Sequence, residues 1–141
     1  MLPTLPKPDD YCSLVIRTDF SNDAAWHRVL ADATQEGPEG YAAYLTPVDD
    51  PAFAGLAPTA CQAVPTKSYI GNHVFLADAQ SMADGSLVVV ALGEYVDEPG
   101  QSFRVVPQEM PGVQSNLSIS NMNFEEFARA ADATGVFHGF E

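Results

Sequence analysis

The sequence predicts an α/β fold, a single domain in which helices pack on a mixed sheet of five or six strands. Apolar β-rich runs alternate with helical windows in the first half of the chain, a pattern typical of parallel strands joined by helical crossovers. The runs at 74–77 and 86–92 lie only about eight residues apart, which is too close for a parallel crossover, so they should pair antiparallel. The expected element order is β-α-β-α-β-β-β-(β)-α.

The first strand and helix are expected within residues 11–40. The unbroken run LVI at 14–16 favours a strand over 11–19 that is covered on both faces. Ser21 or Asn22 should cap the helix that follows. The apolar stripe of that helix consists of Trp26, Val29, Leu30 and Ala33.

The next segments predict a second strand and two short helical turns. The strand is expected over 41–48, and Asp50 followed by Pro51 is typical of an N-cap and first helical position. A second helical start is expected at Pro58, and residues 65–72 should form a loop.

The later strands are separated by turns. Residues 97–100 predict a turn into a strand over 102–106, whose apolar and polar residues alternate so that one face is wet. Residues 107–112 are expected to be irregular. The alternation within 116–120 predicts a further short strand, with Leu117 and Ile119 on its apolar side.

A last helix should begin at Asn123, with Glu126 three residues later as its capping-box partner. Its apolar face consists of Phe124, Phe127, Ala128 and Ala131. Gly135 is expected as the residue that ends this helix with positive φ, and Phe137 and Phe140 should fold back on the core.

The composition narrows the classes of partner. The chain has 19 Asp and Glu against 6 Lys and Arg, a formal net charge of −13, which disfavours nucleic acids and anionic membranes and favours cations or a basic protein partner. Residues 1–10 form an N-terminal arm rich in proline and acids, unlike a signal peptide, and residues 11–141 form the domain. We therefore expect a cytoplasmic protein whose two cysteines, Cys12 and Cys61, are reduced.

Charged residues follow the predicted strands at the points where they end. Arg17 and Asp19 close the first strand, Asp49 and Asp50 the second, and Asp78 the third; Arg104 lies on the fifth. Because ligands of open α/β sheets bind beyond the carboxyl ends of the strands, we expect these side chains to form a ligand-binding rim.

The rim admits several chemical interpretations. The rim could bind a small polar ligand, with Asp19 or Asp49 as a catalytic base. Alternatively, its carboxylates could hold Mg²⁺. A purely structural ion pair between Arg17 and Asp19 is the simplest. No pair among His27, His73 and His138 has metal-ligand spacing and the chain carries no nucleotide-binding motif, so we expect no cofactor and no metal site.

A polar row, Asn116, Ser118, Ser120 and Asn121, accompanies the apolar residues of the 116–120 segment. These side chains either line a pocket or face solvent on an edge strand. Of the row, Asn116, Ser118 and Asn121 are kept as ligand-binding candidates. Nucleophilic catalysis has little support, because no serine is flanked by the glycines of a nucleophile elbow.

Several segments together resemble a known family: LVIRTDFSNDAAW at 14–26, VDDPAFAGL at 48–56, DEPGQSFRVVP at 97–107 and NLSISNMNFEEFA at 116–128. The chain is similar to small uncharacterised bacterial proteins, mostly from actinomycetes, that are grouped as a domain of unknown function. The resemblance implies a single bacterial domain and carries over no activity, cofactor or catalytic residue.

The sequence leaves three functions open. The first is a non-catalytic protein that binds a small ligand or protein partner at the strand-end rim. The second is a small enzyme of secondary metabolism, an isomerase, cyclase or hydrolase, with an aspartate as general base beside Arg17 or Arg104. The third is an antidote that blocks a basic enzyme by charge complementarity. The oligomeric state is not predicted.

Overall fold

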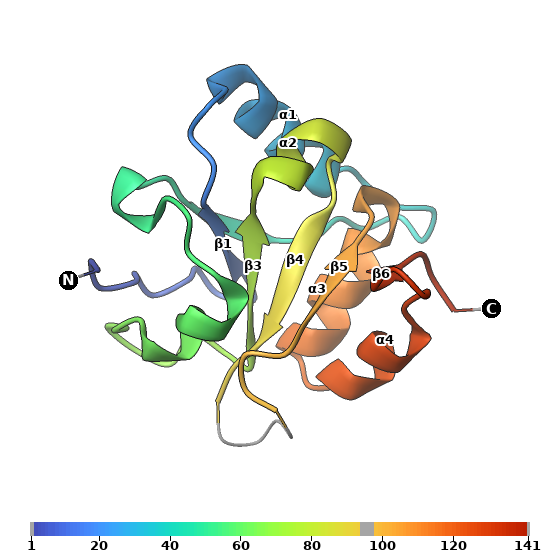
Figure 1. Ribbon diagram of the computed structural model, residues 1–141. Coiled ribbons are helices and arrows are strands. Elements are labelled where there is room, and N and C mark those ends of the chain that lie inside the picture. The colour runs from blue at the N-terminus through green and yellow to red at the C-terminus, as the bar shows by residue number, and fades with distance from the viewer. Residues whose placement is uncertain (1, 94–97, 141) are drawn as a thin grey trace.

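One mixed sheet forms the centre of the computed structural model, which describes residues 2–93 and 98–140 (Figure 1). Among these residues, six strands are hydrogen-bonded in the order β2 (Leu45–Val48), β1 (Ser13–Arg17), β3 (His73–Ala77), β4 (Leu87–Ala91), β5 (Ser102–Val105) and β6 (Val136–Phe137). β4 is antiparallel to both of its neighbours, and the other pairings are parallel. The α/β class, the mixed sheet and the antiparallel pairing of the third and fourth strands are thereby confirmed.

The helices divide between the two faces of the sheet. The chain forms α1 (Asp23–Ala33), α2 (Ala79–Asp84), α3 (Met110–Ser118) and α4 (Phe124–Ala130), and the 3-10 turns η1 (Pro51–Phe53), η2 (Pro58–Ala63) and η3 (Pro107–Glu109). One buried apolar cluster joins the sheet to α1, α3 and α4, and a second joins its other face to η1, η2 and the N-terminal segment. Both faces are therefore covered, and the first strand has no wet side.

The first helix begins and packs as its sequence predicts. The side chain of Asn22 accepts a hydrogen bond from the backbone N–H of Ala25 at 3.0 Å, which satisfies one of the free donors of the first turn. Trp26, Val29 and Ala33 are buried against the sheet. Asp50 caps η1 in the same way, through the N–H of Ala52 at 2.9 Å.

The N-terminal arm is held against the domain chiefly through Leu5. Leu5 is buried in the second apolar cluster, and its backbone N–H donates to the carbonyl of Pro65 at 2.8 Å. Burial of this side chain holds the arm against the 65–72 loop, although prolines exclude a helix there. Residues 2–10 are thus less loose than their composition indicates.

An aromatic cluster joins the last helix to the sheet. Asn123 caps α4 by accepting from the N–H of Glu126 at 3.1 Å, which is the Asn123 half of the predicted capping box. Phe127 lies edge-on to Phe137 with 5.2 Å between ring centroids, and Phe137 stands 5.0 Å from Phe140. The expected return of the C-terminal tail onto the core is confirmed.

The predicted strand at 116–120 is wrong, as is the irregular segment at 107–112. α3 occupies this region, with Pro111 in its first turn and with Met110, Val113 and Leu117 buried at helical spacing. In the short window, an alternation of Leu117 and Ile119 fits either structure; here Leu117 is buried while Ile119 is 62% exposed beyond the helix end.

Other short elements went unpredicted for local reasons. The nine-residue link between β3 and β4 contains α2, which begins with a reciprocal capping box between Asp78 and Ser81 and ends at Gly85 in the left-handed conformation. Gly135 does not end α4, which stops at Ala130; its φ of +82° serves the turn into the two-residue strand β6. Part of the predicted turn at 97–100 lies outside the described residues.

Candidate functional site

The strand ends gather at one end of the molecule, near α1 and α2 (Figure 1). Thr18, directly after β1, donates its N–H to the carbonyl of Ala77 at the end of β3, at 2.8 Å. A guanidinium nitrogen of Arg17 lies 3.3 Å from the carboxylate of Asp49, which follows β2. The parallel strands therefore bring their terminal side chains together, as the chain order predicts.

The guanidinium of Arg17 is buried and bonded to groups of the protein itself. Only 3% of its side chain is exposed, and its nitrogens reach Asp23 at 2.8 Å, Asp49 at 3.3 Å and the backbone carbonyl of Asp19 at 2.8 Å. Its guanidinium also lies over the rings of Phe20 and Trp26. The ion pair considered between Arg17 and the Asp19 carboxylate is not formed, because Arg17 binds the Asp19 backbone carbonyl and the carboxylate binds Ser21. This half of the rim is a structural cluster in which Arg17 pairs with Asp23 and Asp49.

The carboxylate of Asp19 forms hydrogen bonds within the turn that follows β1. It accepts hydrogen bonds from the hydroxyl of Ser21 at 2.5 Å and from the N–H of Ser21 at 2.9 Å. These bonds hold the pKa of Asp19 below its ordinary value. A general base works best with a pKa near the working pH, so this environment gives Asp19 no special fitness for that role.

Arg104 and Asp78 form the other half of the rim. Two nitrogens of Arg104 bind the two carboxylate oxygens of Asp78 at 3.0 and 2.7 Å, and one also donates to the hydroxyl of Ser86 at 3.2 Å. Burial raises the pKa of Asp78, but the hydrogen bonds from Arg104 and Ser81 outweigh burial and leave the pKa lowered. Asp78 is therefore the ionised partner of Arg104 at neutral pH.

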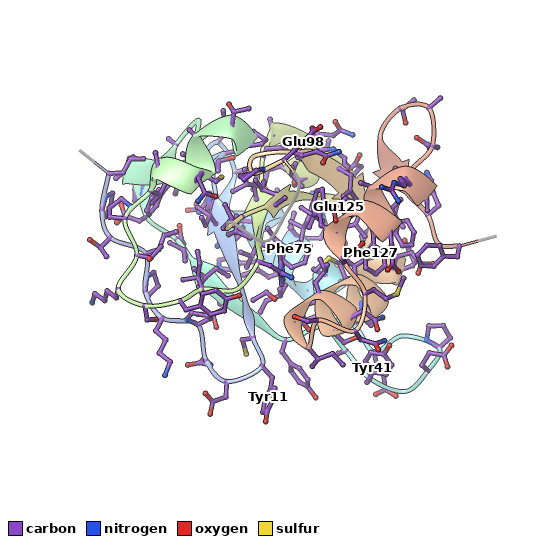
Figure 2. The ribbon with its side chains drawn as sticks, turned by 90° about the horizontal axis from the view of Figure 1, so that it is seen from below. Tyr11, Tyr41, Phe75, Glu98, Glu125 and Phe127 are labelled. Atoms are coloured by element: carbon purple, nitrogen blue, oxygen red, sulfur yellow. The ribbon has the colours of Figure 1, made fainter. Side chains whose placement is uncertain are left out.

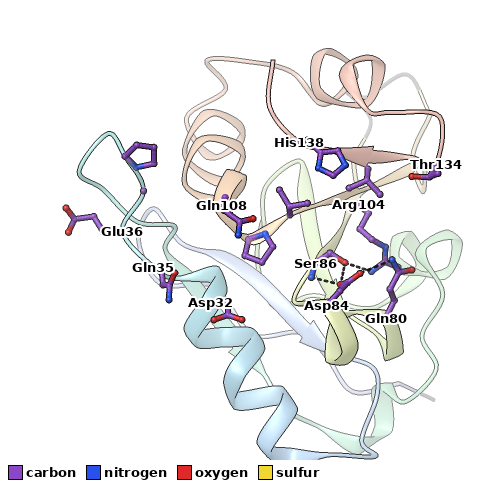
Figure 3. Close-up of a pocket in the computed structure, with 15 residues that line it drawn as sticks. Asp32, Gln35, Glu36, Gln80, Asp84, Ser86, Arg104, Gln108, Thr134 and His138 are labelled. Atoms are coloured by element: carbon purple, nitrogen blue, oxygen red, sulfur yellow. Dashed lines mark hydrogen bonds between the residues drawn. The ribbon is translucent and has the colours of Figure 1, made fainter. Parts of the chain in front are cut away.

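A cavity of about 590 Å³ opens beside Arg104 (Figure 3). Its walls come from the end of α1, from α2, from the carboxyl end of β5 and from the segment around β6. Its polar lining consists of Asp32, Gln35, Glu36, Gln80, Asp84, Ser86, Arg104, Gln108, Thr134 and His138. The term "Arg104 cavity" is used for this space below.

Some carboxylates that line the Arg104 cavity have hydrogen-bond partners and others do not. Asp84 accepts from Ser86 and Gln80, and although burial raises its pKa, those bonds leave the pKa lowered. By contrast, the side-chain carboxylates of Asp32 and Glu36 have no hydrogen-bond or ion-pair partner within the described part of the chain. Since Arg104 is neutralised by Asp78, Asp32 on the last turn of α1 leaves this wall of the cavity with an unpaired negative charge. The exposed side chain of Glu36, beyond the end of α1, points away from the other lining residues (Figure 3).

A buried polar network occupies the opposite end of the sheet. The hydroxyl of Ser13 lies 2.7 Å from Nε2 of His73, whose Nδ1 lies 2.7 Å from the side-chain oxygen of Asn72. Gln114 donates to the Ser13 oxygen at 3.0 Å, so the Ser13 proton is free for Nε2 of His73. Burial lowers the pKa of His73 to about 4, which keeps the ring neutral.

Ser13, His73 and Asn72 follow one another in the order of a catalytic serine, a base and the group that orients the base. The network nevertheless has a structural role. Ser13 is 2% exposed and its oxygen already has two partners. Gln114 also binds the carbonyl of Tyr11 and the N–H of Tyr44, so it fastens α3 to the start of the sheet. The sequence shows no sign of the network because its two central residues are 60 positions apart.

The polar row of the last segment is not at the rim. Asn116 donates to the carbonyl of Gly112, Ser118 to that of Ser115, and Asn121 to the side chain of Asn116, all within α3 and the turn after it. That helix end lies near the amino ends of β1 and β3. Of the binding residues that the sequence predicted, Arg104 therefore lines the large cavity. The other polar residues of the cavity were not predicted, because they belong to no sequence motif.

Within residues 2–93 and 98–140, no group of three or more His, Cys, Asp or Glu side chains is arranged to hold a metal ion. The same residues include no helix with the length and apolar character needed to cross a membrane. Cys12 and Cys61 are free thiols, and burial raises the pKa of Cys61 to about 11.

The sequence model of a family described as "Domain of unknown function (DUF6924)" matches residues 12–140. The chain belongs to this family. Its domain in this chain thus includes the whole sheet, both halves of the rim and the Arg104 cavity, while the family description carries no activity. No curated protein and no solved structure matches the chain.

Proposed function

We propose that this bacterial protein binds a small cationic ligand, carrying an amine or guanidinium group, in the Arg104 cavity. The observation that carries the proposal is the carboxylate of Asp32, a half-buried lining residue without a partner in the described chain, while the exposed Glu36 adds negative charge at the edge of the cavity. An ionised carboxylate that faces a partly enclosed space attracts a cation more strongly than one in open solvent, because the surroundings screen it less.

The size and lining of the cavity support a small organic ligand. A volume of about 590 Å³ falls within the range of small-molecule sites. Amide side chains of Gln35, Gln80 and Gln108 can both donate and accept hydrogen bonds, so they can orient a polar group beside the charge. Apolar surface from Val106, Pro107 and Val136 offers contact for a short carbon chain.

The fixed geometry of Arg104 supports the same proposal. Its bidentate pair with Asp78 holds the guanidinium against one wall and neutralises it. An anionic ligand would have to displace Asp78 from Arg104, whereas a cationic ligand can use the free carboxylates directly. The net charge of −13 adds a long-range attraction for cations.

The experiment is a calorimetric titration with a panel of linear diamines, guanidino amines and their neutral alcohol counterparts. We expect binding of the amines alone, and a loss of affinity of about tenfold or more in the variant Asp32→Asn/Glu36→Gln, about 1.4 kcal/mol in binding free energy. Glu98→Gln/Glu126→Gln, which removes two negative charges from exposed positions outside the cavity, is the matched control and should bind as the parent does. Equal affinity of all three proteins would contradict the proposal.

A catalytic role is the weaker alternative. Asp49 remains a possible base, since its side chain is about half exposed beside Arg17, but no cavity described here is lined by it. Placement in the cytoplasm belongs to the same proposal and is supported by two cysteines that stand as free thiols.

A further inference from the structure

A second cavity, of about 270 Å³, lies at the amino end of the sheet. Three segments line it: residues 8–12 before β1, residues 69–73 that lead into β3, and the end of α3 with the turn after it. This amino-end cavity is at the other end of the strands from the Arg104 cavity, so a ligand in one would not touch the other.

Two exposed tyrosines line the amino-end cavity. Tyr11 is 78% exposed and Tyr69 is 79% exposed, although large aromatic side chains are ordinarily covered. Figure 2, which views the molecule from this end, shows Tyr11 projecting away from the body of the protein. Exposed aromatic side chains around a hollow are typical of surfaces that bind other proteins.

The backbone is held in a strained form at the same place. Among the described residues, the two with positive φ that are not glycine are Tyr11 at +64° and Ser120 at +56°, and both line this cavity. Gln114 fixes the first by donating to the carbonyl of Tyr11 at 3.0 Å. Strain of this kind persists where the surroundings enforce it, and it is frequent at binding sites.

The negative charge of the amino-end cavity favours a cationic ligand. Asp9 and Asp10 line it, their carboxylates have no partners in the part of the chain that the structure describes, and no described lysine or arginine is among the lining residues. His73, which also lines it, is kept neutral by burial. Tyrosine faces beside carboxylates form a site for a cation, because the ring face and the carboxylate both attract positive charge.

We propose that the amino-end cavity docks an arginine or lysine side chain from an extended segment of a partner protein. The aliphatic stem would lie against Tyr11 and Tyr69, and the charged group would pair with Asp9 or Asp10. A second copy of this chain is a poor occupant, since it would bring another acidic face against an acidic face in a protein of net charge −13.

The test is an NMR titration of the full chain with a capped nonapeptide that has one central arginine among glycine and serine. The same peptide with citrulline, which keeps the shape and removes the charge, is the ligand control. We expect shift changes confined to residues 9–12, 69–73 and 118–120 with the arginine peptide, and at least about fivefold weaker binding with citrulline.

Variants then separate the tyrosine contribution from general charge attraction. Tyr69→Ala leaves the net charge unchanged and should weaken binding about five- to tenfold. Tyr44→Ala is the matched control, because Tyr44 is 58% exposed and does not line this cavity. The proposal is overturned if the two peptides bind alike, if Tyr69→Ala binds as the parent does, or if no local shifts arise at ~10 mM peptide. Shifts only around Arg104, or a solution mass of twice 15.1 kDa by light scattering, would overturn it too.

Discussion

Arg104 of β5 holds both carboxylate oxygens of Asp78, at 3.0 and 2.7 Å, and so links β5 to the end of β3 across the intervening strand β4. The same carboxylate caps α2 through the N–H of Ser81 at 3.0 Å. One aspartate thus positions a helix and neutralises the cation of the cavity. This geometry favours the proposed cationic ligand, and it leads us to expect that Asp78 is important for stability.

Asp78→Asn should lower the free energy of unfolding by about 1–3 kcal/mol, because it keeps a capping side chain but leaves a mostly buried guanidinium without its counter-ion. Urea unfolding at pH 7 measures the change. The control is Asp23→Asn, which makes the same chemical change at an ion pair with Arg17. Because the side chain of Asp23 is 82% exposed and Arg17 keeps other partners, its cost should stay below about 1 kcal/mol. Equal costs for the two variants would contradict this assignment.

His73 should make the protein less stable in mild acid. Burial places the folded pKa at about 4, below the ordinary 6.5, so the unfolded chain takes up the proton first. The stability from the neutral ring is complete above pH 6.5 and is lost as the pH falls toward 4, by up to about 3 kcal/mol.

The measurement for His73 is urea unfolding at pH 7, 6, 5 and 4.5 in parallel with the variant His73→Gln, which cannot titrate. The acidic residues affect both proteins equally, so the difference between the two curves isolates the histidine. Parallel curves over this range would show that His73 has no part in the acid sensitivity.

The aromatic cluster under α4 should account for much of the stability of the C-terminal part. Phe127→Ala should cost about 3–5 kcal/mol, since this buried ring contacts Phe103, Phe137 and Phe140. Phe140→Ala removes the same group from a position that is 55% exposed and should cost about 1 kcal/mol or less. Thermal unfolding followed by circular dichroism compares the two. A similar loss for both would mean that the tail is packed more firmly than its exposure indicates.

The elements that depend on a few consecutive residues were the ones best predicted from the sequence. The run from Leu14 to Ile16, the cap at Asn22 and the cap at Asn123 each depend on a few residues in succession, and each is present in the structure. The segment at 116–120 failed for the same reason, because five residues cannot distinguish an alternating strand from the end of a helix whose buried face began at Met110.

The candidate site was predicted only in part because its residues meet through the fold. Chain direction sufficed to place Arg17, Asp49 and Asp78 at one end of the sheet. It could not indicate that Arg17 is enclosed by its own partners, or that Arg104 borders a cavity whose walls come from four separate segments. The unpaired carboxylates of that cavity, Asp32 and Glu36, lie on the last turn of α1 and beyond it, where acidic residues are ordinarily solvated and carry no motif.

The most direct test of the cationic-ligand proposal is to map where a diamine binds, using ¹H–¹⁵N spectra of the labelled protein at increasing ligand concentration. We expect saturable shift changes in the backbone signals of Asp32, Glu36, Asp84 and His138, and none with the neutral diol of the same length. Changes that are spread over the acidic surface without saturation, or that centre on Asp23 and Asp49, would contradict a binding site in the Arg104 cavity.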